Sequence, residues 1–342
     1  MIDDPQLKTP DGVAEGRGMR VLLATATAVL ALAAPAAAAT GSWDRRDQRA
    51  VTDAGLMATL SDGAFHGERA VAGTELQGAL HTLADRLTVA RVPVPTGRVT
   101  LAGFDRLLVA QLGLADVAQT VQDQARDAGL TPPPRFGTEV VARLLGLRFN
   151  QPVSRERLEL YPWDPITRGD AAYSLARVLA FDGTQVQAVR AALARFVLPR
   201  YGPRTLRALR VAVQRIGMPY IWGGVLDRAG GWQAHGGYDC SGLAWRVYKQ
   251  TGLAHIGGRT AAQQAAEIPR SERLTLAEAH PGDLLFFGPG RVWQRATEKR
   301  IVHEGIALSG DWMIHSSTQG VFVSPLFDSW RAREFSWARR VL

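Results

Sequence analysis

The sequence is poor in cysteine: Cys240 is the single one in 342 residues. This count excludes a disulfide within the chain, which is the usual state of cysteines in exported proteins. No C-x-x-C or H-x-x-x-H pair occurs either, so the ligand spacing typical of a zinc site is missing. The lone thiol is therefore a buried spectator, a site of pairing between chains, or a reactive nucleophile.

Long hydrophobic runs are also missing, because the longest, Val21 to Leu32, is too short and too rich in alanine for a comfortable membrane span. It follows Arg17 and Arg20 and leads into an alanine-rich exit, an order typical of a secretory signal peptide. We therefore expect residues 1–39 to be a signal peptide and the protein to be secreted, associated with the cell wall or envelope. Met19 is an alternative start of the chain, and an uncleaved membrane anchor is the alternative role of this segment.

Acidic residues are in deficit, with 32 Asp and Glu against 40 Lys and Arg. A basic excess suits an anionic neighbour such as nucleic acid, an acidic wall polymer or a membrane surface. The basic residues are scattered, however, and no nucleic-acid-binding motif accompanies them, so we expect no nucleic-acid partner. The length and the ordinary hydrophobic fraction of 46% indicate a globular protein of about two domains.

Residues 40–200 are predicted to form a helical domain. Three segments each place a polar cap before apolar residues spaced three and four apart, as in helices: Leu76–Leu83, Leu107–Leu114 and Ala171–Leu179. Such self-similarity is typical of small helical units that stack on one core. The third segment, ITRGD followed by AAYSLARVL, resembles the surface-layer homology repeat of wall-anchored bacterial proteins, and the other two resemble it more weakly. The resemblance implies attachment to an anionic wall polymer, and a helical spacer is the alternative.

The run Leu198–Pro203 (LPRYGP) is the predicted boundary, and residues 203–342 carry the candidate chemistry. Within this second domain, Cys240 stands just before a helical pattern that Gly252 closes. The cysteine therefore lies at a helix N-terminus, where free backbone N–H groups favour a thiolate and can donate to an oxyanion.

Two histidines follow on predicted strands. His303 lies in the run 301–308 and His315 in the run 312–317, with Ser309–Asp311 as the turn. A three-residue turn pairs position 303 with 317 and leaves His315 on the same face, about 7–8 Å away at the backbone. A two-residue turn would instead place the two rings on opposite faces. The pattern favours a Cys/His nucleophilic pair over a structural role or a zinc site.

Four blocks in this domain resemble the NlpC/P60 family of papain-like cysteine peptidases. The resemblance implies an α+β papain-like fold. It also implies that Cys240 is the nucleophile, His303 the base and His315 the residue that orients the base. The four blocks are GMPYIWGG from Gly217, YDCSGLAWRVYKQTG from Tyr238, HPGDLLFFGPG from His280 and IVHEGIALSGDWMIHSS from Ile301.

The same resemblance implies further roles. Tyr220 would help to bind the oxyanion, and Asp239 would grip the free amine of a wall peptide. Ser241, Arg259 and Trp222 lie at motif positions beside the nucleophile and are expected to contact substrate.

The implied activity is that of a peptidoglycan DL-endopeptidase, which cleaves the D-glutamyl–diamino acid bond of the stem peptide. This chemistry needs no cofactor and no metal. Two alternatives remain open. One is an amidase or acyltransferase on the same fold, and the other is an inactive wall-binding structural protein.

Three departures from the family pattern concern the substrate. Ala261 replaces a serine that helps to bind the peptide amine, which weakens the expectation of a free N-terminal L-alanine. Glu304 follows the base where a small apolar residue is usual, and it is expected to face solvent. Residues 225–237 form an insertion that either roofs the cleft or is a tolerated surface loop.

Overall fold

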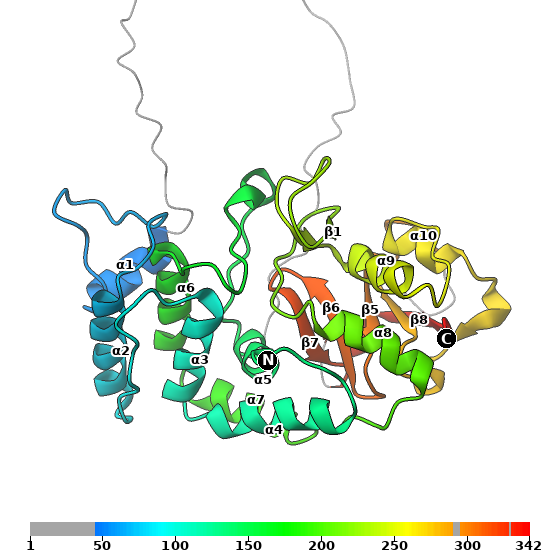
Figure 1. The fold of residues 1–342 in the computed structure, drawn as a ribbon, viewed down its shortest axis with the longest axis horizontal. Helices are drawn as coiled ribbons and strands as arrows, with labels where there is room; N and C mark the ends of the chain where they lie inside the picture. The colour runs from blue at the N-terminus through cyan, green and yellow to red at the C-terminus, as the bar shows by residue number, and fades with distance from the viewer. Residues whose placement is uncertain (1–44, 290–294, 328–329) are drawn as a thin grey trace, which may run out of the picture.

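The computed structural model describes residues 45–289, 295–327 and 330–342. A helical N-terminal part is followed by an α+β part built on an antiparallel sheet (Figure 1), which confirms the predicted fold class. The predicted signal peptide, residues 1–39, lies outside the described residues. Within the described ranges, no helix has the length and apolar character needed to cross a bilayer.

The N-terminal part contains the three predicted repeat helices, which are α2, α3 and α6. Thr100 and Thr167 cap α3 and α6, because each threonine side chain accepts a hydrogen bond from the backbone N–H three residues later. The cap predicted for the first repeat is absent, since Ala72 occupies the N-cap of α2. The helices of this part are α1 (Arg45–Asp53), α2 (Gly73–Leu87), α3 (Leu101–Gln111), α4 (Ala115–Asp127), α5 (Phe136–Leu144), η1 (Val153–Leu158), α6 (Arg168–Leu179) and α7 (Thr184–Leu193).

The N-termini of α2, α3 and α6 meet at one place. The backbone N–H of Val71 donates to the carbonyl of Ile166 at 3.0 Å, and the N–H of Ile166 donates to the carbonyl of Val99 at 3.0 Å. Arg168 is buried there and forms an ion pair with Glu75 in the first turn of α2. The three repeats are thus tied together at the ends where the helix dipoles are positive.

The C-terminal part is organised around a six-stranded antiparallel sheet with the strand order β3-β8-β4-β5-β6-β7. A short hairpin of β1 and β2 stands beside it. The elements are α8 (Pro203–Val213), β1 (Val225–Leu226), β2 (Gly237–Tyr238), α9 (Cys240–Thr251), α10 (Ala261–Ala266), η2 (Arg270–Glu272), β3 (Arg273–Leu274), η3 (Leu276–Glu278), β4 (Leu284–Phe287), β5 (His303–Ala307), β6 (Trp312–Ser317), β7 (Gly320–Pro325), α11 (Trp330–Glu334) and β8 (Phe335–Arg339).

Strand β5 lies inside this sheet, between β4 and β6. Helix α9 packs against β5 and β6, and α5 of the N-terminal part packs against β7. All residues of β4, β5 and β6 are buried. Strand β4 is accordingly a continuous apolar run, whereas β5 and β6 also bury polar side chains, among them His303, Glu304 and His315.

The two parts share one hydrophobic core. The Phe196 ring packs edge-on against Trp312 of β6 with a centroid distance of 5.0 Å, and the Trp312 indole donates to the carbonyl of Arg195 at 3.1 Å. At the other end of the junction, the Arg135 guanidinium donates to the carbonyl of Ile216 at 2.9 Å. The predicted boundary near residue 200 is therefore a linker between two parts that are packed together.

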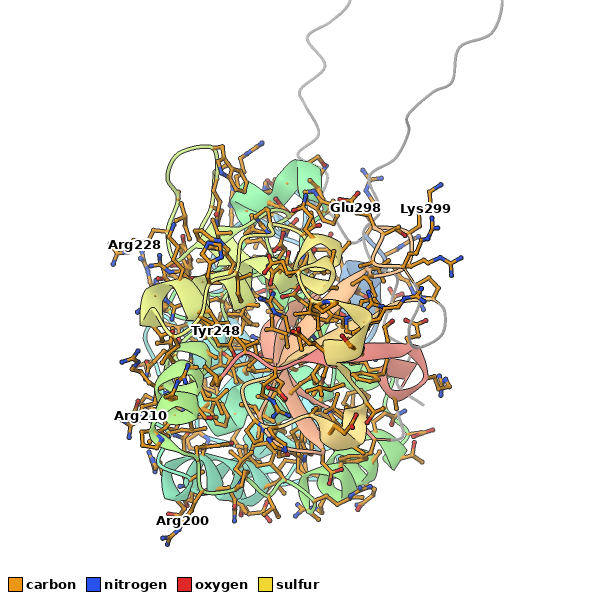
Figure 2. The ribbon with its side chains drawn as sticks, turned by 90° about the vertical axis from the view of Figure 1, so that its right-hand side faces the viewer. Arg200, Arg210, Arg228, Tyr248, Glu298 and Lys299 are labelled. Atoms are coloured by element: carbon orange, nitrogen blue, oxygen red, sulfur yellow. The ribbon has the colours of Figure 1, made fainter. Side chains whose placement is uncertain are left out.

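The basic residues are spread around the molecule. Figure 2 shows Arg200, Arg210, Arg228 and Lys299 pointing outward from separate places on the surface, as their scatter along the sequence suggests. Tyr248, labelled in the same view, lies inside, where its hydroxyl donates to the carbonyl of Gly282.

Candidate active site

Cys240 is the first residue of α9, as predicted from the sequence. Asp239 is the N-cap, and its carboxylate accepts a hydrogen bond from the N–H of Gly242 at 2.6 Å. A side chain at position 242 would lie 1.9 Å from the carbonyl oxygen of Gly224, so only glycine permits this approach of the helix start to the PYIWGG block. The local sequence therefore fixes the position of the thiol at the open end of the helix.

The Cys240 thiol is partly buried. Burial raises its pKa well above the usual value for cysteine, and the carboxylates of Asp239 and Glu304 raise it further. Hydrogen bonding from the backbone N–H groups of Glu304 and Ser241 acts in the opposite direction. Since Glu304 directly follows His303, these contacts also place the sulfur beside the start of β5. The thiol is protonated at neutral pH and needs a base.

His303 and His315 face each other as the three-residue turn predicts. The register of β5 and β6 pairs Ile306 with Ile314 and Ala307 with Met313, which extends to 303 opposite 317. Nε2 of His303 lies 3.0 Å from Nδ1 of His315, and the rings are nearly perpendicular. Burial lowers the pKa of both imidazoles well below the usual value for histidine, so both are neutral.

Gly305 leaves room for the side chains of β6 beside the two histidines. It lies directly opposite His315, and a side chain there would meet the Cβ of His315 at 3.1 Å and the sulfur of Met313 at 2.8 Å. The glycine of the HEGIA block is thus required by the close approach of β6.

A serine that the sequence analysis did not single out completes the chain of contacts. The Ser324 hydroxyl of β7 lies 2.9 Å from Nε2 of His315, so both nitrogens of His315 are engaged. If Nε2 of His303 carries the proton and donates to His315, then Nδ1 of His303 is the nitrogen left to accept a proton. His315 must then be protonated on Nε2 and donate to Ser324. In this arrangement His315 and Ser324 would orient the His303 ring while its Nδ1 accepts a proton.

Arg259 holds both Asp239 and Ser241. Its guanidinium donates to Asp239 Oδ2 at 2.8 Å and Oδ1 at 3.1 Å, and to the Ser241 hydroxyl at 3.0 Å. Burial raises the pKa of Asp239, and the bidentate Arg259 opposes that shift. The predicted substrate residues Asp239 and Ser241 are thus occupied by a residue of the chain, whereas Arg259 keeps part of its side chain exposed.

Tyr220 lies near Cys240, and Trp222 is two residues further along the chain. Tyr220 is buried, and its backbone forms a bridge to Tyr238, two residues before Cys240. Burial raises the pKa of the Tyr220 hydroxyl well above the usual value, and the charge of Cys240 raises it further. The hydroxyl is therefore a neutral donor close to the thiol, whereas Trp222 is 46% exposed.

Glu304 does not face solvent, so the expectation for this residue is wrong. The side chain is fully buried, and neither carboxylate oxygen has a hydrogen-bond partner in the described part of the chain. Burial raises its pKa well above the usual value for glutamate, and the charge of Asp239 adds to the shift. The reason is positional, since β5 is an inner strand with both of its faces covered.

The insertion at residues 225–237 is an ordered hairpin. The Gln233 side chain accepts hydrogen bonds from the N–H of Val225 at 2.9 Å and donates to the carbonyl of Gly237 at 3.0 Å. Its returning arm contacts the N-terminal part, because the Tyr161 ring stacks on His235, two residues before β2, with a centroid distance of 4.3 Å. The hairpin therefore joins the two parts beside Tyr220 and Trp222.

The described ranges contain no group of three or more histidine, cysteine or acidic side chains arranged to hold a metal ion. The chemistry available at the site is that of a thiol, two imidazoles, a tyrosine hydroxyl and the free amides at the start of α9.

Comparison with known proteins finds relatives of the C-terminal part. Residues 217–340 match the NlpC/P60 family model. Over 138 residues the chain is 31% identical to a probable endopeptidase of Mycobacterium tuberculosis (Rv2190c), covering 38% of this chain and 30% of that protein. It is 30% identical to the murein DD-endopeptidase MepH of Escherichia coli, covering 40% and 45%. The chain thus spans less than half the length of these relatives.

Among solved structures, the NlpC/P60 domain of the peptidoglycan hydrolase SagA is 27% identical, with coverage of 40% of this chain and 98% of that one and a TM-score of 0.31. The family model, and not this likeness, identifies an NlpC/P60 domain at residues 217–340. The match does not extend to the helical part and gives no support to its resemblance to surface-layer homology repeats.

Proposed function

We propose that this protein is an exported cysteine endopeptidase that cleaves the D-glutamyl–diamino acid bond of peptidoglycan stem peptides. The observation that carries the proposal is that Cys240 begins α9, the helix that packs on the two strands carrying His303 and His315. The thiol lies near Glu304 at the start of β5, and the two imidazoles are 3.0 Å apart. Relatives of residues 217–340 with this family pattern carry endopeptidase names.

The proposed reaction begins with a neutral pair. Burial raises the pKa of the thiol and lowers that of His303, so the resting pair is a neutral thiol and a neutral imidazole. The proton therefore moves from Cys240 to Nδ1 of His303 only as the sulfur attacks the amide carbonyl. His303, now an imidazolium, is stabilised by donating from Nε2 to His315. The oxyanion accepts hydrogen bonds from the Cys240 backbone N–H and the Tyr220 hydroxyl.

Breakdown of this intermediate releases the amine of the diamino acid, which takes its proton from His303. The D-glutamyl carbonyl remains bound to Cys240 as a thioester. A water molecule then gives a proton to His303 and attacks the thioester, which frees the acid and restores the thiol. His303 acts in both halves of the reaction, and His315 keeps its ring in place.

For substrate binding we propose Arg259 and Trp222 as the groups that face the peptide. Asp239 and Ser241 hold the Arg259 guanidinium in place through hydrogen bonds that they accept from it. A free peptide amine would have to compete with the Arg259 guanidinium for the Asp239 carboxylate. Together with Ala261, this favours stem peptides whose N-terminus is not free.

Defined muropeptides test the proposal. Incubation of the mature protein with a stem tripeptide, a cross-linked dimer and a sugar-linked stem peptide, followed by mass spectrometry, identifies the bond that is cut. Cleavage between D-glutamate and the diamino acid supports the proposal, whereas cleavage of the cross-link would assign the DD bond named for MepH. Release or transfer at another amide would assign an amidase or acyltransferase. No turnover together with retained wall binding would indicate an inactive wall-binding protein.

Cys240→Ala is the companion variant. It should keep the melting temperature of the parent and lose all turnover, because no other thiol exists in the chain. Cleavage of wall peptide by this variant would eliminate the thiol mechanism.

The helical part is proposed to hold the enzyme on anionic wall polymer, and residues 1–39 to export it to the wall or envelope. The meeting of the α2, α3 and α6 N-termini supports the first point, because helix N-termini attract anions. Arg69 and Arg98 are exposed in the loops that enter α2 and α3. Replacing both with glutamate should release the protein from isolated walls at lower salt than Arg106→Glu, an exposed control on the side of α3. Mass determination of the secreted protein would locate the mature N-terminus.

A further inference from the structure

Exposed aromatic side chains gather where the two parts of the molecule meet. Among the described residues, the large hydrophobic side chains that remain exposed are Val89, Val153, Leu158, Trp163, Val197, Trp222 and Trp232. Five of these seven belong to two segments, residues 153–163 of the helical part and 222–232 of the peptidase domain. Exposed apolar clusters of this kind mark binding surfaces.

Ring stacking and hydrogen bonds join the first segment to the second and to the two residues His235 and Gly236 that follow it. Tyr161 is sandwiched between Trp163, at a centroid distance of 5.0 Å and an interplanar angle of 9°, and His235, at 4.3 Å and 26°. The Tyr161 hydroxyl accepts a hydrogen bond from the N–H of Gly236 at 2.9 Å. The backbone N–H of Trp222 donates to the Glu156 carboxylate at 2.7 Å. These contacts hold the segments that carry Trp163 and Trp222 together across the junction.

The cluster is continuous with the candidate active site. The Gly224 carbonyl accepts from the N–H of Asp239 at 3.2 Å, next to the nucleophile. Trp222 is only two residues away from Gly224, and two residues span at most about 7 Å. The Trp232 ring lies against Gly223, where a Cβ would be 3.1 Å from it. The segment that carries Trp222 and Trp232 therefore adjoins the start of α9, where Cys240 lies.

In peptidoglycan each stem peptide is joined through its first residue to an amino sugar of the glycan strand. If the scissile bond follows the second residue, the sugar lies two residues of chain, about 7 Å when extended, plus its linker from the carbonyl attacked by Cys240. Pyranose rings have flat C–H faces that pack on indole rings, and separate exposed indoles suit such rings better than a continuous aliphatic surface would.

We infer that Trp163, Trp222 and Trp232 form a sugar-binding face that receives the amino-sugar rings adjoining the bound stem peptide. The inference rests on the proposed function for the identity of the peptide. It assigns to the helical part, through Trp163, a direct role in choosing glycan-linked over free stem peptides.

The test compares two ligands with the full chain carrying Cys240→Ala, so that nothing is cleaved. One ligand is a stem tetrapeptide and the other is the same peptide linked to its disaccharide, with affinities measured by calorimetry. The parent should bind the glycan-linked peptide more tightly than the free peptide. Trp163→Ala should reduce that preference about five-fold, as expected for loss of one ring contact, and leave the affinity for free peptide unchanged. Trp232→Ala should act in the same direction.

Two controls keep the outcomes distinct. Val197→Ala removes an equally exposed apolar side chain outside the cluster and should leave the preference intact. Trp163→Phe should restore part of it, because a flat ring remains. An unchanged preference in Trp163→Ala and Trp232→Ala, or binding of a protein partner in place of the disaccharide, would overturn the inference. Sugar-dependent binding that needs Trp163, together with no cleavage by the parent enzyme, would instead reject the proposed hydrolysis and keep the sugar site.

Discussion

Ser324→Ala is the most informative single change at the candidate active site. Ser324 reaches Nε2 of His315 at 2.9 Å from strand β7, and both residues are buried. The serine is not among the groups proposed to bind the peptide, and it contacts His303 only through His315. Its removal therefore tests whether the contacts behind the base contribute to turnover.

The size of the effect follows from the protonation states. When His303 is an imidazolium it donates to Nδ1 of His315, so His315 must carry its proton on Nε2. Without Ser324 that buried N–H has no acceptor, which costs about 1–3 kcal/mol. If about 1–2 kcal/mol of this falls on the state with protonated His303, kcat decreases about 5- to 30-fold.

The same loss predicts a shift in the pH profile. Burial already lowers the pKa of His303. A less stable imidazolium lowers it further, by about one unit for 1.4 kcal/mol. Because the enzyme is active when His303 is neutral, the acid limb of kcat/KM should move to lower pH in the variant.

Steady-state assays on a soluble muropeptide, from pH 4 to 9, measure both effects. Ser324→Thr keeps the hydroxyl and should recover most of kcat. Ser174→Ala is the matched control, since it deletes another buried serine hydroxyl, 2.7 Å from the Leu147 carbonyl in the helical part. It should change stability without changing kcat or the pH profile. A Ser324→Ala enzyme with the kcat and acid limb of the parent would refute the proposed tautomer chain.

Three further changes probe other features. Arg143→Met leaves Asp105 and Glu139 buried without their shared cation and should cost about 3–5 kcal/mol in urea unfolding; a smaller loss would mean that the fold does not depend on this pairing. Glu304 has a raised pKa, so its protonated form stabilises the fold below about pH 4.5 and this contribution is lost as pH rises toward the folded-state pKa. Glu304→Gln cannot ionise and should flatten the fall of the melting temperature with pH, whereas an unchanged slope would show that other groups cause it. Tyr220→Phe should lower kcat about 10- to 1000-fold with little change in KM, and equal kcat would remove the hydroxyl from the oxyanion site.

The pairing of His303 with His315 could be predicted because it depends on local rules only. The turn Ser309–Asp311 fixes the register, and the period of two in a strand then decides which side chains share a face. The position of Cys240 followed in the same way from the apolar pattern after it and from Gly252, which ends α9 in a left-handed conformation.

The contact of Ser324 with His315 and the burial of Glu304 could not be predicted from single strands, because both depend on how the strands pair and pack. Ser324 meets His315 only because β6 and β7 pair with Ser317 opposite Gly320, which places position 324 diagonally beyond Phe322. Glu304 looked like a solvent-facing carboxylate because an isolated strand has a free face. Its burial results from the position of β5 within the six-stranded sheet and from the helices that cover it.

The packing of the two parts against each other could not be predicted from the sequence either. Apolar periodicity identifies a buried face on each helix but does not tell which other face covers it. Residues 153–163 have a weak pattern of their own, and their contacts with residues 222–236 arise only when the two parts are packed together. The boundary predicted near residue 200 therefore separates residues 153–163 from residues 222–236, although the two form one surface in the folded chain. Through the proposed sugar-binding face the helical part contributes to substrate choice as well as to attachment, so an isolated peptidase domain is an incomplete guide to specificity.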